Sequence, residues 1–378
     1  MTPGAPHAAA SSVGLRDVAR LAGVSEATAS RALAGSRSVR SELRERVLRS
    51  AATLDYRPNP HARALARARD ASVGVVVHDV GDPYFAEIVR GALSAAQANE
   101  RMLLICDTGR DPERELAYLR HFRAQRVEAV LIAGSGRNDR AATAALSTEV
   151  LGLEAAGARA ILIGRHEVAG DCVMPDNVGG ARAVARHLAG LGHRQIGVIA
   201  GPMELTTTAD RLFGFRAGLA ELGIRLDSSW IRCGEFTRDG GARAALALLE
   251  RHRELTALFA LNDLMAIGAL SALRRLGSQV PGQVSVAGFD DVASAGDVTP
   301  ALTTVRVPTA EIGRRAFDLA FAPRGEGFRR ERIATELVIR QSTAPPARRR
   351  MPEGPGAPGR AVDREARPRA GARRKECR

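Results

Sequence analysis

The sequence lacks the long apolar segments and leader features that mark membrane and secreted proteins. It has 378 residues and contains no uninterrupted run of roughly 18 or more apolar residues, so we expect no transmembrane helix. The opening residues, MTPGAPHAAASS, hold neither a basic segment nor an apolar one, which argues against a secretory signal. With 45% apolar residues the chain can still form ordinary cores in two or three units. We therefore expect a globular protein of the cytoplasm.

Cysteine is scarce and scattered. The four cysteines form no CxxC pair, so the sequence predicts neither a disulfide framework nor a zinc site. We expect reduced thiols, mostly buried, and no metal or cofactor. The positions are Cys106, Cys172, Cys233 and Cys377.

Enzyme signatures are missing as well. GxxxxGK[ST] occurs nowhere, and no GxGxxG follows the first expected strand at HDVGDPYF. The GSG at 134–136 lacks a third glycine at the required place, so we interpret it as a loop. His193 in GLGHRQ has no serine or cysteine nucleophile motif nearby, and we interpret it as a structural turn residue. We expect no catalysis.

What the sequence does have is basic charge, and it lies at the two ends. Residues 1–70 hold 12 Arg against 6 acidic residues, whereas residues 71–344 are neutral with 32 of each sign. A neutral body with a basic N-terminal unit is typical of a protein that binds polyphosphate with one end, although a solvated basic surface gives the same count. Residues 345–378 carry a net +7 and few large apolar residues, so we predict a disordered basic tail.

Two short helices around a turn are predicted in LRDVARLAGVSEATASRALAG. Leu15, Val18, Ala19 and Ala22 give the first helix one apolar face, and Gly23 permits the turn. Val24 should fill the angle between the helices, and Ser25 is placed to cap the second helix. Ala29, Ala32 and Leu33 would face inward. The outward face would then be short and polar, as close approach to a major groove requires: Glu26, Ala27, Thr28, Ser30 and Arg31.

A third helix follows, with Ser41 as its expected cap. Its apolar stripe is Leu43, Val47, Ala51 and Leu54, and three arginines outside that stripe are candidate phosphate contacts: Arg40, Arg44 and Arg49. A three-helix unit without DNA-binding function is the alternative.

The segment after this unit predicts a short helix that needs a partner. Asn59 and Pro60 form a helix start signal, and the helix can have only about two turns before Asp70, too few to be stable alone. Ala62 is small enough for close packing of two copies, and Leu65 is large enough to wedge between base steps of a minor groove. The alternative is an ordinary linker.

These segments carry a family resemblance. DVARLAGVSEATASRAL and VRSELRERVLRSAATLDYRPNPHARAL resemble the headpiece and hinge of the lactose/galactose repressor (LacI/GalR) family of bacterial regulators. The resemblance continues through DPYF, DNVGG, HLAGLGHRQIGVIAG, ALNDLMAIGAL, VSVAGFDD, PALTTVRVP and ATELVIRQSTAPP, so that it covers residues 14–346. It implies a homodimer of two-lobed bodies like periplasmic binding proteins, each with a helix-turn-helix DNA headpiece.

The resemblance also assigns DNA-contact positions. Glu26 and Ala27 occupy the two base-reading positions, where Glu can accept from cytosine N4 and Ala can touch a thymine methyl group. Arg31 is implied as a third contact, and Arg16 is a further candidate. The chain departs from the family at Gly14, where a threonine is usual, and at three positions around the second helix where valine and asparagine are usual: Ala29, Ala32 and Ala34.

Beyond residue 71, β-branched apolar runs alternate with amphipathic helices. Buried parallel strands are predicted at 72–78, 102–106, 129–133, 160–164, 196–200, 257–261 and 284–288. About nine strands are too many for one small sheet, so we expect a doubly wound α/β body of two lobes with a cleft.

Ligands of such folds bind beyond the carboxyl ends of the strands. Polar groups there could bridge the hydroxyls of a sugar, and aromatic rings could cover its face, although Asp is also a common helix cap and Phe85 could be core. The candidates are Asp79, Tyr84, Phe85, Arg165, Thr207, Arg211, Phe236, Asn262, Asp263 and Asp290. The purine-sensing branch of the family has Arg where this chain has Leu205, which favours a sugar or sugar derivative, although Phe236 and Thr207 resemble that branch. Two cleft arginines would also tolerate an acidic sugar.

The domain prediction follows. Residues 1–13 form a disordered start, 14–57 the headpiece, 58–70 the hinge, 71–344 the effector-binding and dimerisation body, and 345–378 the tail. We expect a sequence-specific regulator on the nucleoid, with a near-palindromic operator and a small-molecule effector. A transporter's sugar-binding protein is the rival interpretation, which the basic headpiece disfavours.

Overall fold

The computed structural model describes residues 14–33, 39–56 and 72–347. The first two ranges form the helical unit, with α1 at Leu15–Ala22, α2 at Glu26–Leu33 and α3 at Ser41–Thr53. Val18, Ala29 and Val47 are each 0% exposed and form the centre of its small core. The predicted apolar faces of the three helices are confirmed, since Leu15, Leu33, Leu43 and Leu54 pack against that core.

The turn between α1 and α2 has the expected local chemistry. Gly23 adopts a left-handed conformation with φ of 61°, and the Ser25 hydroxyl accepts a hydrogen bond from the Thr28 amide at 3.2 Å. The prediction for Ser41 was wrong. Helix α3 already begins at Ser41, so the capping position falls on Arg40, whose side chain makes no capping bond.

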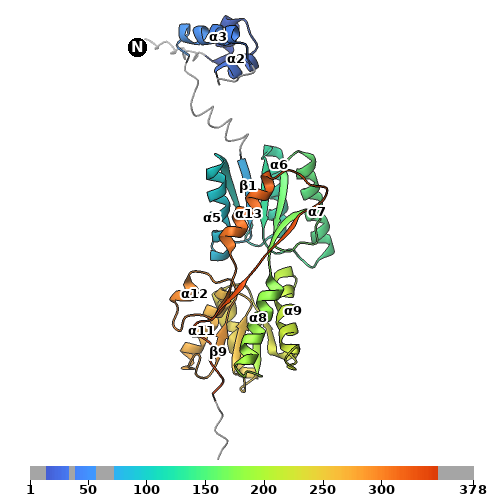
Figure 1. Cartoon of the computed structure of the whole chain (residues 1–378), viewed down its shortest axis with the longest axis vertical. Helices are drawn as coiled ribbons and strands as arrows, with labels where there is room; N and C mark the ends of the chain where they lie inside the picture. The colour runs from blue at the N-terminus through green and yellow to red at the C-terminus, as the bar shows by residue number, and fades with distance from the viewer. Residues whose placement is uncertain (1–13, 34–38, 57–71, 348–378) are drawn as a thin grey trace, which may run out of the picture.

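The first lobe of the body is built on a six-stranded parallel sheet in the order β11-β5-β4-β3-β1-β2 (Figure 1). Helices α5 and α13 cover one face, and α6 and α7 cover the other. The strands are β1 Ser72–Val77, β2 Met102–Asp107, β3 Ala129–Ala133, β4 Arg159–Ile163, β5 Asp171–Pro175 and β11 Arg330–Ile333. The helices are α5 Pro83–Ala98, α6 Pro112–Gln125, α7 Arg140–Ala155 and α13 Thr309–Phe321.

The second lobe has a four-stranded parallel sheet in the order β7-β6-β8-β9, with an antiparallel pair of β10 and β12 beside it. Its strands are β6 Ile196–Ala200, β7 Ile231–Cys233, β8 Ala257–Ala260, β9 Ser285–Ala287, β10 Thr304–Arg306 and β12 Glu336–Val338. Its helices are α8 Asn177–Gly190, α9 Thr206–Ala220, α10 Arg238–Arg251, α11 Asp263–Arg275, the short α12 Ser294–Asp297 and a 3₁₀ turn at Ser228–Trp230.

The chain crosses between the lobes three times: from β5 to α8, from β10 to α13, and from β11 to β12 (Figure 1). Two crossings are joined, because the Asp176 amide donates to the Ile333 carbonyl at 2.9 Å and the Thr335 hydroxyl donates to the Asp176 carbonyl at 3.1 Å. The two-lobed prediction is therefore confirmed.

All seven predicted strands are present, and no end differs from the prediction by more than one residue. The five strands that the sequence did not indicate are short or only partly buried, so they lack a continuous apolar run. The prediction that β2 is buried was wrong, because β2 is an edge strand whose Met102 and Ile105 are exposed. The cysteine prediction needs correction too, because Cys172 is buried, Cys106 is half-buried and Cys233 is exposed. Among the described residues, no helix has the length and apolar content to cross a membrane.

Helices α5 and α13 approach each other so closely that only glycine fits at their contact. A Cβ atom on Gly91 would lie 1.8 Å from the Ala310 carbonyl oxygen, and one on Gly313 would lie 1.9 Å from that of Ile88. These obstacles are backbone atoms, so a side chain could be accommodated only by moving a helix.

We expect Gly91→Ala to lower the free energy of unfolding by about 1–3 kcal/mol, because it overpacks this contact. Urea denaturation followed by circular dichroism would measure the change. The control is Gly190→Ala in α8, where a Cβ meets no atom within 4 Å and the better helix propensity of alanine should hold or raise stability. Equal effects of the two substitutions would contradict the prediction.

Candidate functional site

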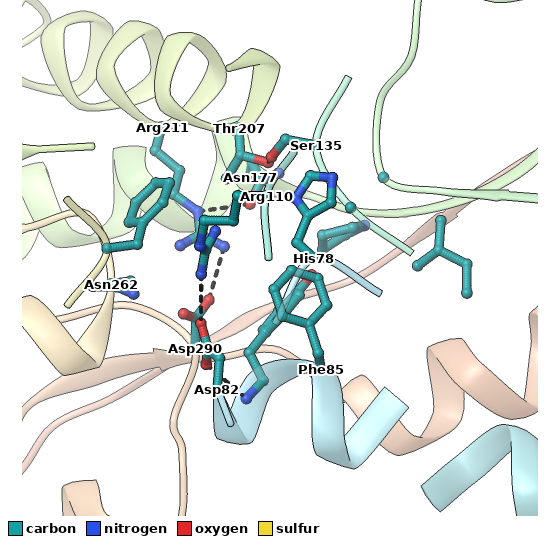
Figure 2. Close-up of a pocket in the computed structure, with 16 residues that line it drawn as sticks. His78, Asp82, Phe85, Arg110, Ser135, Asn177, Thr207, Arg211, Asn262 and Asp290 are labelled. Atoms are coloured by element: carbon teal, nitrogen blue, oxygen red, sulfur yellow. Dashed lines mark hydrogen bonds and ion pairs between the residues drawn. The ribbon is translucent and has the colours of Figure 1, made fainter. Parts of the chain in front are cut away.

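A pocket of about 520 Å³, partly open to solvent, lies between the lobes at the carboxyl ends of their strands (Figure 2). The first lobe contributes His78, Asp82, Tyr84, Phe85, Arg110, Gly134, Ser135, Ile163 and Gly164. The crossing at β5 and the second lobe contribute Pro175, Asn177, Thr207, Arg211, Phe236, Asn262 and Asp290.

Arg211 organises the second-lobe wall. Its guanidinium, on a residue only 2% exposed, donates to the Asn177 side-chain oxygen at 2.9 Å and to Asp290 Oδ1 at 2.8 Å. It also donates to the Leu261 carbonyl and lies 3.8 Å from the centre of the Phe289 ring. Figure 2 shows the bonds to Asn177 and Asp290 converging on this side chain. The remaining donors of this guanidinium and the second oxygen of Asp290 are free to meet a ligand.

Asp290 is held in an unfavourable backbone conformation. Its φ is 118°, a region that non-glycine residues rarely adopt, and the next residue, Asp291, is at 57°. Hydrogen bonds fix this segment, since the Asp290 amide donates to Val305 at 2.8 Å and its carbonyl accepts from Val307 at 3.2 Å. Burial raises the pKa of Asp290 to about 7, against the opposing influence of Arg211. Strain kept at a pocket wall is typical of a functional position.

Asn262 combines two roles. Its side-chain oxygen accepts from the Met265 amide at 3.0 Å and so caps α11. The amide nitrogen of the same side chain is left as a donor at the pocket wall. A capping residue at the end of β8 can therefore also contact a ligand.

The first-lobe wall joins charges to aromatic rings. Asp82 accepts from the Tyr84 amide at 3.0 Å, which starts α5, and forms a 3.3 Å ion pair with Arg110. The Arg110 guanidinium lies 5.8 Å from the ring centres of both Phe85 and Phe236, so it faces aromatic groups of both lobes. Tyr84 meets Phe85 edge to face at 5.2 Å, and burial raises the pKa of the Tyr84 hydroxyl, so that it remains a neutral donor.

The ring of His78, also in this wall, has no hydrogen-bonding partner among the described residues. Its ring lies 5.7 Å from Phe85, and burial, with the nearby Arg110, lowers the pKa of His78 to about 3. The imidazole is therefore neutral at ordinary pH and offers one donor and one acceptor.

Seven of the ten expected effector residues line the pocket: Tyr84, Phe85, Thr207, Arg211, Phe236, Asn262 and Asp290. The other three do not. Asp79 turns to the Gly81 amide at 2.9 Å and to Arg110, and Arg165 pairs with Asp210 and Glu167. Asp263 is 0% exposed and accepts from the Val292 amide and the Thr304 hydroxyl, so it supports the loop after β9.

Five polar residues that the sequence did not indicate also line the pocket: His78, Asp82, Arg110, Ser135 and Asn177. His78 and Asp82 flank Asp79 in HDVGDP, so the signal lay in the same motif but favoured the wrong carboxylate. Arg110 follows the edge strand β2, where its backbone has a φ of 65° and its side chain reaches the pocket. Asn177 was visible as part of DNVGG, but nothing local indicated its contact with Arg211.

Polar contacts hold the lobes together beside the pocket. The Ser135 hydroxyl bonds the Thr207 hydroxyl, the Thr206 amide donates to the Gly136 carbonyl at 2.9 Å, and the Thr206 hydroxyl donates to the Arg165 carbonyl at 2.7 Å. Arg165 adds an ion pair to Asp210 at 2.9 Å. Arg165 therefore links the lobes instead of facing the pocket.

Two other expectations concern groups outside the pocket. His193 is 1% exposed, and its ring bonds the hydroxyls of Thr256 and Ser285 and the Ala344 carbonyl at 2.9–3.1 Å, which confirms a structural role. Within the described ranges no cluster of His, Cys, Asp or Glu has the arrangement of a metal site.

On the helical unit, α2 presents Glu26, Ala27, Ser30 and Arg31 to solvent, and Thr28 is half-buried. Glu26 forms a 3.2 Å ion pair with Arg16 of α1, so the two side chains occupy one exposed patch. Arg31 folds back to donate to the Ala27 carbonyl at 3.1 Å. Asn59, Ala62 and Leu65 lie outside the described residues.

Comparison with known proteins gives two family matches and close relatives. Residues 14–59 match the model described as bacterial regulatory proteins of the lacI family, and residues 185–343 match a periplasmic binding protein-like domain. The chain is 38% identical over 308 residues to the HTH-type transcriptional regulator GalS of Salmonella typhimurium, covering 81% of this chain and 88% of the relative.

Solved structures agree. The cellobiose complex of the transcriptional regulator CelR is 32% identical with a TM-score of 0.64, over 87% of this chain and 99% of that one. The lac repressor dimer bound to operator and the anti-inducer ONPF is 26% identical with a TM-score of 0.70, over 88% and 99%. These similarities confirm the expected fold and the expectation of a regulator instead of an enzyme.

We expect His78→Gln to weaken the acid sensitivity of the protein. The unfolded chain protonates His78 below its ordinary pKa near 6.5, whereas the folded chain does so only near 3, so this group's contribution to stability is complete above 6.5 and is lost as the pH falls toward 3. When the pH is lowered from 7.5 to 5, the free energy of unfolding should fall in both proteins. The fall should be smaller in His78→Gln than in the wild type, by up to about 2 kcal/mol. Urea titrations at both pH values would measure this.

The control is His121→Gln on the exposed surface of α6, which should behave as the wild type does. If the free energy of unfolding falls equally in the wild type and in His78→Gln, the low pKa of His78 in the folded protein is wrong.

Proposed function

Because the chain belongs to the lacI family of bacterial regulatory proteins, we propose that it represses transcription from a near-palindromic operator and that a sugar in the interlobe pocket switches its DNA affinity. The observation that carries the proposal is one chain with both an exposed helix-turn-helix face and a pocket of alternating aromatic and hydrogen-bonding groups between two lobes.

The DNA-binding part is a homodimer that places two copies of α2 in successive major grooves. Glu26, Ala27 and Ser30 would contact base edges, and Arg31 would contact a guanine edge or a phosphate. Arg16 would give up its ion pair with Glu26 and contact the DNA backbone instead. The hinge with Asn59, Ala62 and Leu65 would order on the minor groove. The lac repressor, a dimer on its operator in the related structure, supports this arrangement.

The effector part favours a neutral sugar over a sugar acid. Asn262, Asp290 and Arg211 offer donors and acceptors to adjacent hydroxyls, and Tyr84, Phe85 and Phe236 offer rings to the C–H face of a pyranose. The two arginines that could favour an acid are already engaged, Arg211 by Asp290 and Arg165 by Asp210. The CelR structure holds cellobiose, which supports a saccharide here as well.

The switch follows from the pocket's position. A ligand that touches both lobes favours the lobe arrangement in which both walls reach it, and that arrangement sets the spacing of the two hinges. Ligand and DNA are then coupled through one equilibrium, with reciprocal effects on affinity.

We expect selection from a random-sequence duplex library to return an inverted repeat whose affinity falls steeply with salt. Glu26→Ala should reduce the preference for one base, at one position in each half of the repeat, by about 1–3 kcal/mol. Arg40→Ala should weaken binding to all sequences alike, and it should reduce the slope of log affinity against log salt concentration by about 1. Arg251→Ala, on the surface of the second lobe, is the control and should change neither. Failure to enrich any sequence would refute the proposal.

The effector is tested with the selected duplex and a panel of saccharides. We expect one saccharide to change DNA affinity and to raise the melting temperature. Asn262→Ser keeps an oxygen that can cap α11 but removes the amide donor, so it should weaken saccharide binding about tenfold. DNA affinity without saccharide should remain as in the wild type. A saccharide response unchanged by Asn262→Ser would remove this residue from the site.

A further inference from the structure

A row of arginines follows α8 along the surface of the second lobe. Arg182 and Arg186 lie one turn apart on the helix, and Arg194 follows its end. Helix α8 contains no acidic residue. Among the described residues, only Glu221 at the end of α9 forms ion pairs with these arginines, at 3.4 Å to Arg182 and 2.7 Å to Arg186. Three guanidinium groups therefore share one carboxylate. We call Arg182, Arg186 and Arg194 the α8 ridge.

A structural role accounts for only part of this ridge. Arg194 donates to the carbonyls of Ala189 and His193 at 3.0 Å, at the C-terminal end of α8, where a cation offsets the helix dipole. Arg182 and Arg186 lie in the interior of the helix, so the dipole does not account for them. Solvent-exposed ion pairs such as those with Glu221 contribute little to stability. The positive charge of the ridge is therefore available to a partner.

The last described residues run past the end of α8. The Thr343 hydroxyl bonds the His187 ring at 2.9 Å, the His193 ring bonds the Ala344 carbonyl at 2.9 Å, and Pro346 lies close to Gly192. The described chain therefore ends beside the α8 ridge. Residues 348–378, which lie outside the described residues and which we call the basic tail, hold 11 Arg and Lys against 4 acidic residues and begin with three arginines.

The basic tail and the hinge leave the body at opposite ends. The pocket lies at the carboxyl ends of the strands of both lobes, so the amino ends of the two sheets face away from it in opposite directions (Figure 1). Ser72, where the hinge arrives, is the amino end of β1. The Ala344 amide donates at 3.0 Å to the hydroxyl of Ser285, which is the amino end of β9. The ridge and the tail therefore lie far from the end of the body that carries the headpiece.

The chemistry of this surface favours a polyphosphate over a protein. The basic tail contains no aromatic residue, no leucine and no isoleucine, and protein interfaces depend on such anchors. Arginine binds phosphate oxygens in pairs through its planar guanidinium. From Arg182 to Gly190, α8 rises about 12 Å, a length along which a DNA duplex carries about seven phosphate charges. A duplex therefore supplies enough phosphates for every arginine of the ridge.

We propose that the α8 ridge and the basic tail form a second DNA-binding surface, which reads no sequence and holds a second duplex while the headpieces hold the operator. The proposal goes beyond the proposed operator site and uses it only to anchor the chain. When the headpieces bind one site, other segments of the same DNA molecule are present at high effective concentration, so even a weak second surface can be occupied. The 31 residues of the tail can span at most about 100 Å, which extends the reach of this surface.

The test is the capture of a second duplex by the full chain. The chain is held on an immobilised operator duplex no longer than the inverted repeat, unbound protein is washed away, and a labelled duplex of unrelated sequence is added. We expect capture at low salt, with an affinity that falls about a hundredfold when the salt concentration is raised fourfold, as roughly four phosphate contacts predict. Absence of capture at low salt would overturn the proposal.

Substitutions in the ridge locate the surface. The triple variant Arg182→Gln, Arg186→Gln and Arg194→Gln should weaken capture about tenfold or more and reduce its salt slope by about 3, while operator affinity stays as in the wild type. Glu221→Gln removes the opposing carboxylate and should strengthen capture. A chain that ends at Ala347 should capture less than the full chain.

The control makes the same change in charge on the first lobe. Arg114→Gln, Arg314→Gln and Arg315→Gln replace three exposed arginines, each paired with an acidic residue of its own helix segment, and should leave capture unchanged. Equal capture by the wild type, the ridge variant and the chain that ends at Ala347 would refute the second surface.

Two further outcomes separate the partner and the anchor. If polyglutamate at equal charge concentration displaces the second duplex fully, the surface recognises carboxylate chains, its partner is an acidic protein, and the proposal is wrong. If selection returns no operator, the proposed function fails, but the second surface is still tested. The affinity of the unanchored full chain for the unrelated duplex should then fall in the ridge variant, and an unchanged affinity would overturn the proposal.

Discussion

The pocket depends on the buried ion pair between Arg211 and Asp290. Both residues are less than a tenth exposed, and each charge is stabilised inside the protein by the other. The guanidinium joins α9 to the start of α8 through Asn177, to the end of β8 through the Leu261 carbonyl, and to the loop after β9 through Asp290. Four segments of the second lobe are thus fixed around one side chain, and together they form that lobe's wall.

The contacts between the two lobes differ in kind from the contacts within each lobe. Within a lobe, helices contact each other through glycines such as Gly91 and Gly313, and such a contact has little freedom to move. Between the lobes, the contacts beside the pocket are hydrogen bonds and an ion pair, such as Thr206 to Gly136 and Arg165 to Asp210. Polar contacts exchange readily with water, so the interface between the lobes is weaker than the packing within each lobe. This interface lies beside the pocket, where the energy of ligand binding can move one lobe against the other.

Sequence reasoning located the ends of the strands but could not choose among the polar residues there. Asn262 and Asp263 are neighbours at the end of β8, yet one lines the pocket and the other accepts bonds from Val292 and Thr304 inside the lobe. Likewise, Asp82 lines the pocket, whereas Asp79 accepts a hydrogen bond from the Gly81 amide. Consecutive residues at a helix start point in different directions, and which direction faces the cleft depends on how the loop after each strand is held by distant segments.

The sequence by itself determined the helical unit, the alternation of strands and helices, and the division of charge between a basic end and a neutral body, because apolar periodicity and charge counts are local properties. Only the tertiary structure decided that Arg165 links the lobes while Arg211 lines the pocket, and that Asp82 lines the pocket while Asp79 does not. These outcomes depend on contacts between segments far apart in the chain, such as Arg211 with Asp290. Side-chain environment is set by such contacts, and no local pattern encodes them.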